Sequence, residues 1–383
     1  MNNTHQRLFA LTEHLLQQMA NNGGAISFQD CMQAALYQPG LGYYQREEVF
    51  GEQGDFTTST AMGKWLALGF VESIKKSWEA LGKPQNWTLI EQGGGTGILL
   101  TNVLTTLQDI GLTPSHVFAV ETSDSLRNRQ QQLYEAHHLD VHQVSTLDDI
   151  TPVETAIYFS NELPDAFPVR SFIWQGKSLI ERGVDWDGQA FIWQNLSEIN
   201  ASAHQIPESI QQLWPEDYIS EFNPHLLAWQ QSLSKLFQRG VVLTVDYGYS
   251  QKEYYRPQRI GGTLMGHHKH QAVDDVLKLS PGVCDITAHV DFSALKSIGE
   301  SLGLTAYAYT TQGAWLAQAD MVQQRIQALA ENPTNDTIAE MTFAKRLMLP
   351  NGMGESFKIL VQGKALSDAS CLHIPAFDRL HTL

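Results

Sequence analysis

A glycine-rich turn between a strand and a helix is the feature that most constrains how this chain folds. Residues 87–92 (WTLIEQ) read as a short apolar strand, and residues 98–110 (ILLTNVLTTLQDI) carry leucines at helical spacing. The turn between them holds four glycines, Gly93, Gly94, Gly95 and Gly97. Glycines at such a turn let the backbone approach a ligand closely, beside the N-terminus of the helix. The pattern predicts the first strand–helix unit of a ligand-binding α/β sheet.

The rest of the chain continues this alternation. Further strands are predicted at residues 116–123, 140–147, 155–163, 240–248, 304–312 and 356–364, and further helices at 125–137 and 291–303, the last with Asp291 as N-cap. After Pro168, residues 169–194 have the period-2 pattern of an antiparallel hairpin, and a helical stretch is expected over 206–237. Strands that alternate with helices imply parallel βαβ units. The sequence therefore predicts an α/β, Rossmann-like fold with a mostly parallel, doubly wound sheet.

The residues around the glycine turn indicate which ligand it binds. A dinucleotide-binding fingerprint would place a third glycine where this chain has Ile98. The spacing found instead, acidic Glu91 followed by Gly93, Gly95 and Gly97, is typical of the first motif of Rossmann-like methyltransferases. Glu91 can pair with the cationic amino group of a methionine moiety, whereas it would repel a pyrophosphate. We therefore expect S-adenosylmethionine as the cofactor and disfavour an NAD-dependent dehydrogenase.

Acidic residues after the next two strands extend the predicted cofactor site. Glu121 ends its strand where a carboxylate can accept hydrogen bonds from both ribose hydroxyls. The alternative is a carboxylate that caps the following helix, and Ser123 is a second candidate for that cap. Thr122 lies between them and belongs to the same predicted site. Asp148 and Asp149 follow the third strand, where they either meet the adenine amino group or cap a turn, and both interpretations stay open.

Composition narrows the partners of the chain. Acidic residues outnumber basic ones by 41 to 25, which gives a net charge of −16. This charge disfavours nucleic acid and would attract a cationic segment, although solubility is the simpler interpretation. No apolar run approaches a membrane span, and the N-terminus lacks the apolar core of a secretory signal. Cys31, Cys284 and Cys371 are far apart, which disfavours disulfides and zinc and fits a cytoplasmic protein.

Three histidines close together invite a metal interpretation. His267, His268 and His270 lack the i, i+4 spacing of a helical zinc motif, and no thiol stands near them in the sequence. We therefore predict no metal site.

Several motifs occur in the order in which one known family has them. They are GYY with GDFTTS (42–59), the turn at 91–97, VETSDSLRNRQ (120–130), SNELPDAFPV (160–169), VDYG (245–248), GGTLMGHHKH (261–270), PGVCDITAHVDFSAL (281–295) and TQGAWL (311–316). Through them the chain resembles the MidA-like, DUF185-type methyltransferases, relatives of the mitochondrial complex I assembly factor that methylates an arginine. The resemblance implies a class I methyltransferase core and N-methylation of an arginine in a basic segment of a partner protein.

The resemblance also implies which residues bind and react. Gly54, Asp55 and Phe56 match the family's N-terminal segment that folds over the cofactor, and Asp285 and His289 match its substrate side. A structural Asp–His hydrogen bond is the alternative for that pair.

Asn161, Glu162 and Asp165 follow the fourth strand, at the sheet edge where open α/β folds bind ligands. A guanidinium nucleophile requires carboxylates that orient it and receive its proton, and Glu162 and Asp165 are expected to do this. Asn161 is expected beside both the nucleophile and the cofactor. Asp246, at the end of the fifth strand, is a further candidate for the same cleft. A proline-stiffened loop with solvated carboxylates is the alternative.

The chain departs from the family pattern at two places. Gly94 and Thr96 stand at variable positions of the turn where the family has proline and arginine, and Ala61 replaces an acidic residue. These departures motivate an alternative function, a cofactor-binding assembly or interaction protein with little catalysis. Methylation of a small molecule is a third hypothesis.

The predicted organisation has five segments. They are an N-terminal helical cap with a cofactor-covering loop (1–80), the first part of the core (81–168), a hairpin-plus-helix insertion on the substrate side (169–238), the second part of the core with a helical insertion (239–365) and a C-terminal tail (366–383).

Overall fold

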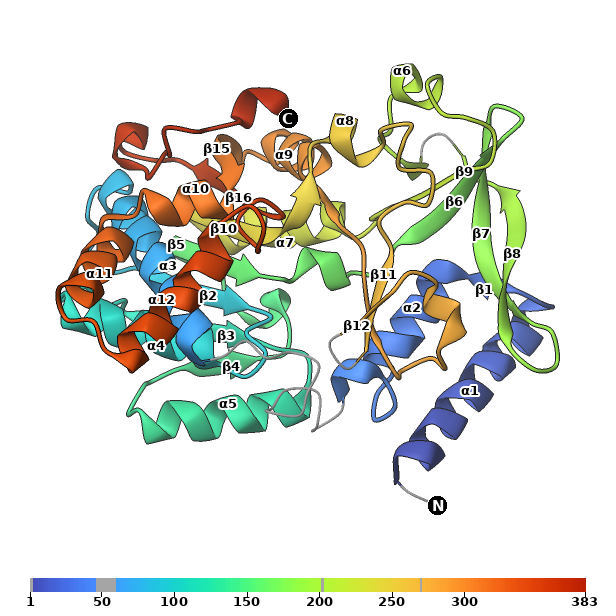
Figure 1. The fold of residues 1–383 in the computed structure, drawn as a ribbon, viewed down its shortest axis with the longest axis horizontal. Coiled ribbons are helices and arrows are strands. Elements are labelled where there is room, and N and C mark those ends of the chain that lie inside the picture. The colour runs from blue at the N-terminus through green and yellow to red at the C-terminus, as the bar shows by residue number, and fades with distance from the viewer. Residues whose placement is uncertain (1–2, 46–59, 201–202, 269–270) are drawn as a thin grey trace. The chain divides into compact units, whose positions relative to one another are not determined.

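The computed structural model describes residues 3–45, 60–200, 203–268 and 271–383, drawn as a coloured ribbon in Figure 1. The chain forms two compact units, each built from separate segments. Unit 1 comprises Met1–Thr57, Pro164–Leu227 and Tyr249–Ala294, and unit 2 comprises Thr58–Leu163, Ala228–Gly248 and Leu295–Leu383. Among the described residues, no helix is both long and apolar enough to cross a membrane.

Unit 2 is built on a largely parallel sheet. Its strands are β2 (Thr88–Gln92), β3 (His116–Val120), β4 (His142–Val144), β5 (Val153–Asn161), β10 (Phe237–Tyr249), β15 (Thr305–Thr311) and β16 (Phe357–Lys364). They lie in the order β15-β16-β10-β5-β2-β3-β4, and the neighbours from β10 to β4 pair in parallel. Strand β16 runs antiparallel between β15 and β10. The strand order reverses direction at β2, as in a doubly wound sheet.

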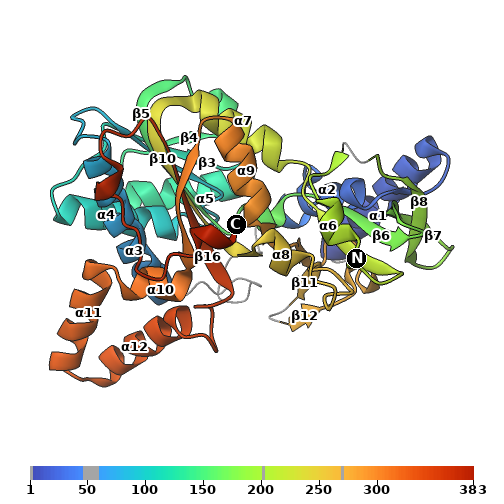
Figure 2. The same cartoon turned by 90° about the horizontal axis from the view of Figure 1, so that it is seen from above.

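Helices cover both faces of this sheet. They are α3 (Thr60–Ala80), α4 (Ile98–Asp109), α5 (Asp124–Ala136), α7 (Leu226–Leu236), α9 (Phe292–Ser301), α10 (Gln312–Ala317), α11 (Asp320–Glu331) and α12 (Asn335–Met348). Because side chains alternate along a strand, Phe159 and Tyr158 of β5 point to opposite faces. Phe159 packs against Phe70 of α3 (ring centroids 4.9 Å apart), and Tyr158 faces Trp229 of α7 (6.3 Å). Figure 2 shows α3 and α7 on these two sides.

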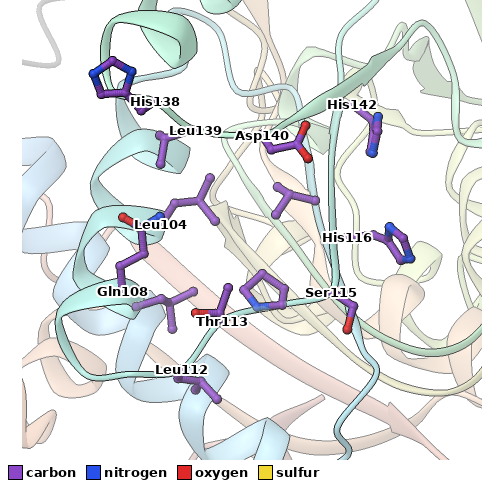
Figure 3. Close-up of a pocket in the computed structure, with 13 residues that line it drawn as sticks. Leu104, Gln108, Leu112, Thr113, Ser115, His116, His138, Leu139, Asp140 and His142 are labelled. Atoms are coloured by element: carbon purple, nitrogen blue, oxygen red, sulfur yellow. The ribbon is translucent and has the colours of Figure 1, made fainter.

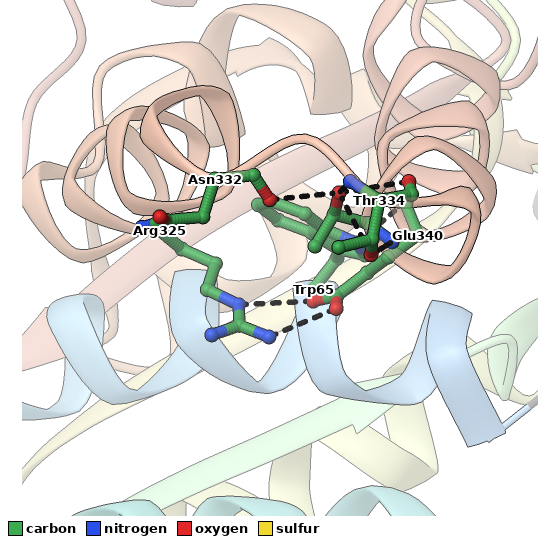
Figure 4. A network of polar contacts seen from close by, with 6 residues as sticks. Trp65, Arg325, Asn332, Thr334 and Glu340 are labelled. Carbon is green, nitrogen blue, oxygen red and sulfur yellow. Dashed lines mark hydrogen bonds and ion pairs between the residues drawn. The ribbon is translucent and has the colours of Figure 1, made fainter.

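The helical pair α11–α12 is an insertion between α10 and β16 that packs on α3. The Trp65 indole donates to the backbone oxygen of Glu340 (3.2 Å), and Arg325 makes a two-point ion pair with the carboxylate of the same residue (2.9 and 2.8 Å). Thr334 begins α12 in a capping box with Thr337. Figure 4 shows the contacts of Arg325, Glu340 and Trp65, which link α11, α12 and α3, and beside them the capping box of α12.

Unit 1 holds two small sheets and two N-terminal helices. Its elements are α1 (Asn3–Asn22), β1 (Ile26–Ser27), α2 (Phe28–Tyr37), β6 (Arg170–Gln175), β7 (Ser178–Trp186), β8 (Phe191–Glu198), α6 (Glu208–Gln211), β9 (Tyr218–Phe222), α8 (Gln251–Tyr254), β11 (Met265–His268), β12 (Gln271–Val273), β13 (Asp285–Thr287) and β14 (Val290–Asp291). One sheet has the order β1-β7-β6-β9 with β8 beside β7, and the other has the order β12-β11-β13.

The predicted strands and helices of the core are confirmed, and so is the α/β class with a mostly parallel sheet. Asp291 caps α9 as expected, since its Oδ1 accepts from the backbone N–H groups of Ser293 and Ala294 (3.0 Å each). The hairpin after Pro168 is also present as β6–β7, and β8 extends it.

The expected helical stretch over 206–237 is wrong in its middle. Strand β9 interrupts it and pairs with residues of β6 that lie 44 to 52 positions earlier in the chain, which a local helical pattern does not register. The segment boundaries differ as well. The predicted N-terminal cap (1–80) is divided between the two units, because α3 belongs to unit 2. Residues 249–294, which were predicted in the second part of the core, belong to unit 1.

Candidate functional site

The glycine turn after β2 has the backbone that only glycine adopts without strain. The φ angles of Gly93, Gly95 and Gly97 are 74°, 53° and 82°. A Cβ on Gly93 would lie 2.9 Å from the Leu163 side chain, and a Cβ on Gly94 would lie 2.3 Å from Oε2 of Glu91. The turn is therefore fixed by its conformation and by its packing, and Gly94 leaves the space that the Glu91 carboxylate takes.

Glu91 is a buried carboxyl just before the glycine turn. Its side chain is 2% exposed, and among the described residues neither carboxylate oxygen has a hydrogen-bond donor. Burial, and then repulsion from Glu121, raises the pKa of Glu91 to about 8. Buried carboxylates are normally paired, so an unpaired one at a glycine turn is a place for an external cation. The ammonium group of S-adenosylmethionine fits this site.

Glu121 stands at the end of β3, one strand further along the same edge. It is 8% exposed, and its Oε1 accepts from the backbone N–H of Ser123 (3.0 Å). Burial raises the pKa of Glu121, against the backbone hydrogen bonds from Ser123, Thr122 and Gly95. One oxygen of Glu121 therefore makes the helix-capping contact. The hydrogen bonds of Glu121 to the ribose stay a prediction, and so does a cofactor contact by the exposed Thr122.

The two aspartates after β4 already have partners within unit 2. Asp149 caps its own turn, where its Oδ2 accepts from the N–H (2.8 Å) and hydroxyl (3.0 Å) of Thr146. Asp148 accepts from the Ser232 hydroxyl of α7 (3.1 Å). Asp149 therefore caps a turn. A contact with adenine stays a prediction for both aspartates.

A row of side chains that the sequence analysis missed braces the turn from α5. Gln130 is fully buried and its amide donates to the Gly95 carbonyl (2.9 Å), while Gln143 donates to Gln130 (3.0 Å). The Tyr134 hydroxyl lies 3.0 Å from where a Cβ on Gly97 would be. Gln130 lies between buried Leu126 and Tyr134 at i, i+4, i+8 spacing, so a polar residue in an apolar stripe was the signal that pointed to it.

Gln92 braces the same turn from the other side of the sheet. Its Oε1 accepts from the Tyr158 hydroxyl (2.8 Å) and from the Trp229 indole (3.0 Å). Tyr158 belongs to β5 and Trp229 to α7, so the last residue of β2 before the turn is fixed by two side chains from distant segments.

The end of β5 carries a strained acidic residue. Glu162 has φ 53°, a left-handed conformation that is uncommon outside glycine, and its N–H donates to the Val245 carbonyl of β10 (3.0 Å). Burial raises the pKa of Glu162 to about 7, against a hydrogen bond from Asn161 (Nδ2 to Oε1, 3.2 Å). Strain of this kind persists where the surroundings enforce it, often at functional sites. Asn161 thus ends β5 and Glu162 follows it, at the edge that holds the glycine turn.

Asp246, near the end of β10, is fully buried at this edge. Its Oδ1 accepts from the N–H of Tyr247 (2.7 Å), and a role in the cleft stays a prediction.

Unit 1 brings two predicted carboxylates to one tyrosine. The Tyr44 hydroxyl donates to Oδ1 of Asp285 (2.7 Å), and both carboxylates are buried. Burial, followed by the charges of Asp285, Tyr37 and Asp165, raises the pKa of Tyr44 well above its ordinary value. Tyr44 therefore stays a donor at any working pH. Within unit 1 it gathers Asp165 and Asp285, which the sequence predicted separately.

The loop that carries Asp165 is anchored through its backbone. The carbonyls of Pro164, Asp165 and Ala166 accept from Asn223 (3.2 Å), Ala288 (2.9 Å) and Tyr37 (2.8 Å), respectively. Three successive carbonyls bound by three separate segments fix the loop, so it is a rigid part of unit 1 rather than a solvated loop.

His289 stacks on an aromatic ring in the same unit. Its imidazole lies parallel to the Tyr249 ring (centroids 5.1 Å apart, planes 6° apart), and its backbone N–H donates to Oγ1 of Thr263 (2.9 Å). The catalytic roles of Asp285 and His289 stay predictions.

Some predicted residues lie outside the described part of the chain. These are Gly54, Asp55 and Phe56, together with the side chain of Ala61 and His270. Within residues 3–45, 60–200, 203–268 and 271–383, no group of three histidines, cysteines or acidic residues is placed to hold a metal ion.

A pocket of about 280 Å³ lies at the opposite edge of the unit 2 sheet. Figure 3 shows His116, His138, His142 and Asp140 around it, at the amino ends of β3 and β4. Because the glycine turn and Glu121 lie at the carboxyl ends, this pocket is separate from the candidate cofactor site.

Comparison with known proteins agrees with this geometry. A family of S-adenosyl-L-methionine-dependent methyltransferases matches residues 71–310. The mitochondrial protein arginine methyltransferase NDUFAF7 of Danio rerio is 25% identical, covering 97% of this chain and 93% of its own, and that of Homo sapiens is 26% identical, covering 91% and 82%. A COG1565 superfamily member from Burkholderia thailandensis, solved with S-adenosyl-homocysteine, is 29% identical with a TM-score of 0.89, covering 100% and 99%.

The doubly wound sheet, the left-handed glycine turn and a buried Glu91 with no donor among the described residues are compatible with a methyl-donor site, and the sequence match spans more than half of the chain. The chain belongs to the S-adenosyl-L-methionine-dependent methyltransferases of this family.

Proposed function

We propose that the protein methylates an arginine side chain of a partner protein. The observation that carries the proposal is the pair of buried carboxylates, Asp165 and Asp285, gathered by Tyr44 in unit 1. A planar guanidinium is held best by carboxylates that accept its forked N–H groups. The relatives in Danio rerio and Homo sapiens are named protein arginine methyltransferases, which supports the same substrate class.

The chemistry assigns separate tasks to the residues of this chain. The bound cofactor supplies a methyl group activated on a sulfonium. Asp165 and Asp285 would hold the guanidinium through its N–H groups, and the nitrogen that takes the methyl group would give up one proton. Within unit 2, Glu162 has a pKa of about 7, which suits a group that exchanges protons at a neutral working pH.

The net charge of −16 supports a basic partner segment, since opposite charge favours encounter. A cytoplasmic location also remains our proposal. It rests on the sequence alone, and the relatives above are named as mitochondrial.

Methyl transfer to defined peptides tests the proposal. Basic peptides that contain one arginine are incubated with the protein and methyl-labelled cofactor, and mass spectrometry locates the label. Peptides with lysine in place of that arginine are the matched control. We expect label on the arginine nitrogen, a loss of at least about tenfold in kcat for Asp285→Asn, and an unchanged Kd for S-adenosylhomocysteine. Label on lysine or on a small molecule would show that the substrate is not a protein arginine. Cofactor binding without any transfer would favour an assembly or interaction protein.

A further inference from the structure

Glu221 is a fully buried carboxyl in unit 1 that the proposed reaction does not use. It lies on β9 and has 0% exposure. Its Oε1 accepts three hydrogen bonds, from the Tyr254 hydroxyl (2.8 Å), the Thr263 N–H (2.9 Å) and the Thr263 hydroxyl (2.5 Å). Its Oε2 has no hydrogen-bond partner among the described residues, so the three donors on Oε1 are what offsets the cost of burying this carboxyl.

These bonds fasten the loop between α8 and β11 to β9. Gly262, which precedes Thr263, has φ 74°, and a Cβ there would lie 2.3 Å from Oε2 of Glu221. The N–H of Ile219 on β9 also donates to the Ile260 carbonyl of the loop (2.8 Å). The position of Thr263 is therefore set by Glu221 and by a glycine that leaves room for its carboxylate.

Thr263 in turn holds His289. The Thr263 Oγ1 accepts the backbone N–H of His289 (2.9 Å) while its hydroxyl proton goes to Glu221. The His289 ring stacks on Tyr249, and the Arg259 guanidinium carbon lies 4.1 Å from the centroid of that tyrosine. Both the backbone and the ring of His289 are thus fixed by residues outside the predicted site.

Electrostatics links the same residues. Burial raises the pKa of the Glu221 carboxyl, whereas hydrogen bonds from Thr263 and Tyr254 and the charge of Arg259 lower it. A leucine at position 221 would fill the same space without the free-energy cost of burying a carboxyl. The carboxyl is therefore explained by its hydrogen bonds to Thr263 and Tyr254 rather than by packing.

We propose that Glu221 is a positioning residue, which acts through Thr263 to hold His289 in place on the substrate side. This inference rests on the proposed function, because the role of His289 belongs to it. Glu221 touches neither substrate nor cofactor in this scheme, and its effect is on the orientation of another side chain.

The test combines the His289 imidazole signal with kinetics. The signal is followed by NMR in histidine-labelled protein and assigned with His289→Gln. Thr263→Val removes the acceptor for the His289 N–H and keeps the shape, while Thr263→Ser retains the hydroxyl. Glu221→Gln keeps an oxygen for all three donors, and Glu221→Leu removes it. Glu181→Gln is the matched control, because Glu181 is also buried in this sheet but pairs with Arg170 on β6.

We expect Thr263→Val and Glu221→Leu to move the His289 signal and to lower kcat by about tenfold to a hundredfold, with the Kd for S-adenosylhomocysteine unchanged. Thr263→Ser, Glu221→Gln and Glu181→Gln should stay close to wild type in both readouts. If Glu221→Leu does not fold, the Thr263 pair decides the matter.

An unmoved His289 signal in Thr263→Val would overturn the inference, as would an unchanged kcat alongside a moved signal. If the wild-type protein methylates no acceptor, the proposed function fails, whereas the NMR signal still tells whether Glu221 and Thr263 position His289.

Discussion

Cofactor binding should release a proton from Glu91. In the free protein, burial and repulsion from Glu121 hold the pKa of Glu91 at about 8, so most molecules carry a neutral Glu91 at pH 7. The ammonium group of the ligand pairs with the charged form, which lowers this pKa in the complex. The complex therefore binds fewer protons than the free protein, and affinity rises with pH.

The size of the effect follows from the pKa of about 8. The fraction of free protein with a charged Glu91 rises from about 1% at pH 6 to about 24% at pH 7.5, a gain of roughly twentyfold in affinity or about 1.8 kcal/mol. Above about pH 8 the α-amino group of the ligand loses its own proton, so affinity should stop rising there. The stability of the free protein should fall over the same range, by up to about 1.4 kcal/mol per pH unit between the unfolded pKa and 8.

Calorimetric titration with S-adenosylhomocysteine measures both quantities. Titrations in two buffers of different ionisation enthalpy give the protons released, which we expect to be close to one at pH 7. Glu91→Gln should bind more weakly, release no proton and lose the pH dependence. Glu135→Gln removes the same charge from the exposed side of α5 and should behave as wild type. A Kd that does not change between pH 6 and 7.5, without proton release, would refute the reasoning.

Three further variants test the site. Gly95→Val should abolish cofactor binding in calorimetry because it forces a β-branched residue to φ 53°, whereas Gly111→Val, also left-handed but with open space around it, should cost stability and leave binding intact. Gln130→Leu removes the donor to the Gly95 carbonyl and should weaken binding by about 1–3 kcal/mol, while Gln131→Leu on the exposed side of α5 should not. Tyr44→Phe should lower kcat with an unchanged Kd for S-adenosylhomocysteine, since it removes the hydroxyl that bonds Asp285, and an equal rise in that Kd would argue against a substrate-side role.

The core was predictable because its signals are local. The apolar run of β2, the glycine turn and the leucine spacing of α4 all lie within residues 87–110, so one stretch of sequence specifies a complete strand–turn–helix unit. Glu91 was predictable for the same reason. Its position relative to the glycines is a matter of spacing, and spacing is what a sequence displays.

Unit 1 was less predictable because its contacts join distant segments. Strand β9 becomes a strand by pairing with β6, and Tyr44 meets Asp285 across 241 residues. In both pairs, the sequence around one partner contains no pattern that indicates the other. Gln130 is intermediate, since its place in an apolar helical stripe was visible although its bond to Gly95 was not.

Two buried glutamates show how the structure separates a ligand site from a scaffold. Glu221 has three internal donors on its Oε1, although its Oε2 has none among the described residues. Glu91 is equally buried but has no hydrogen-bond donor among the described residues. Since buried carboxyls are normally paired, we expect the cofactor to pair with Glu91, whereas the donors on Glu221 fit its proposed task of holding His289.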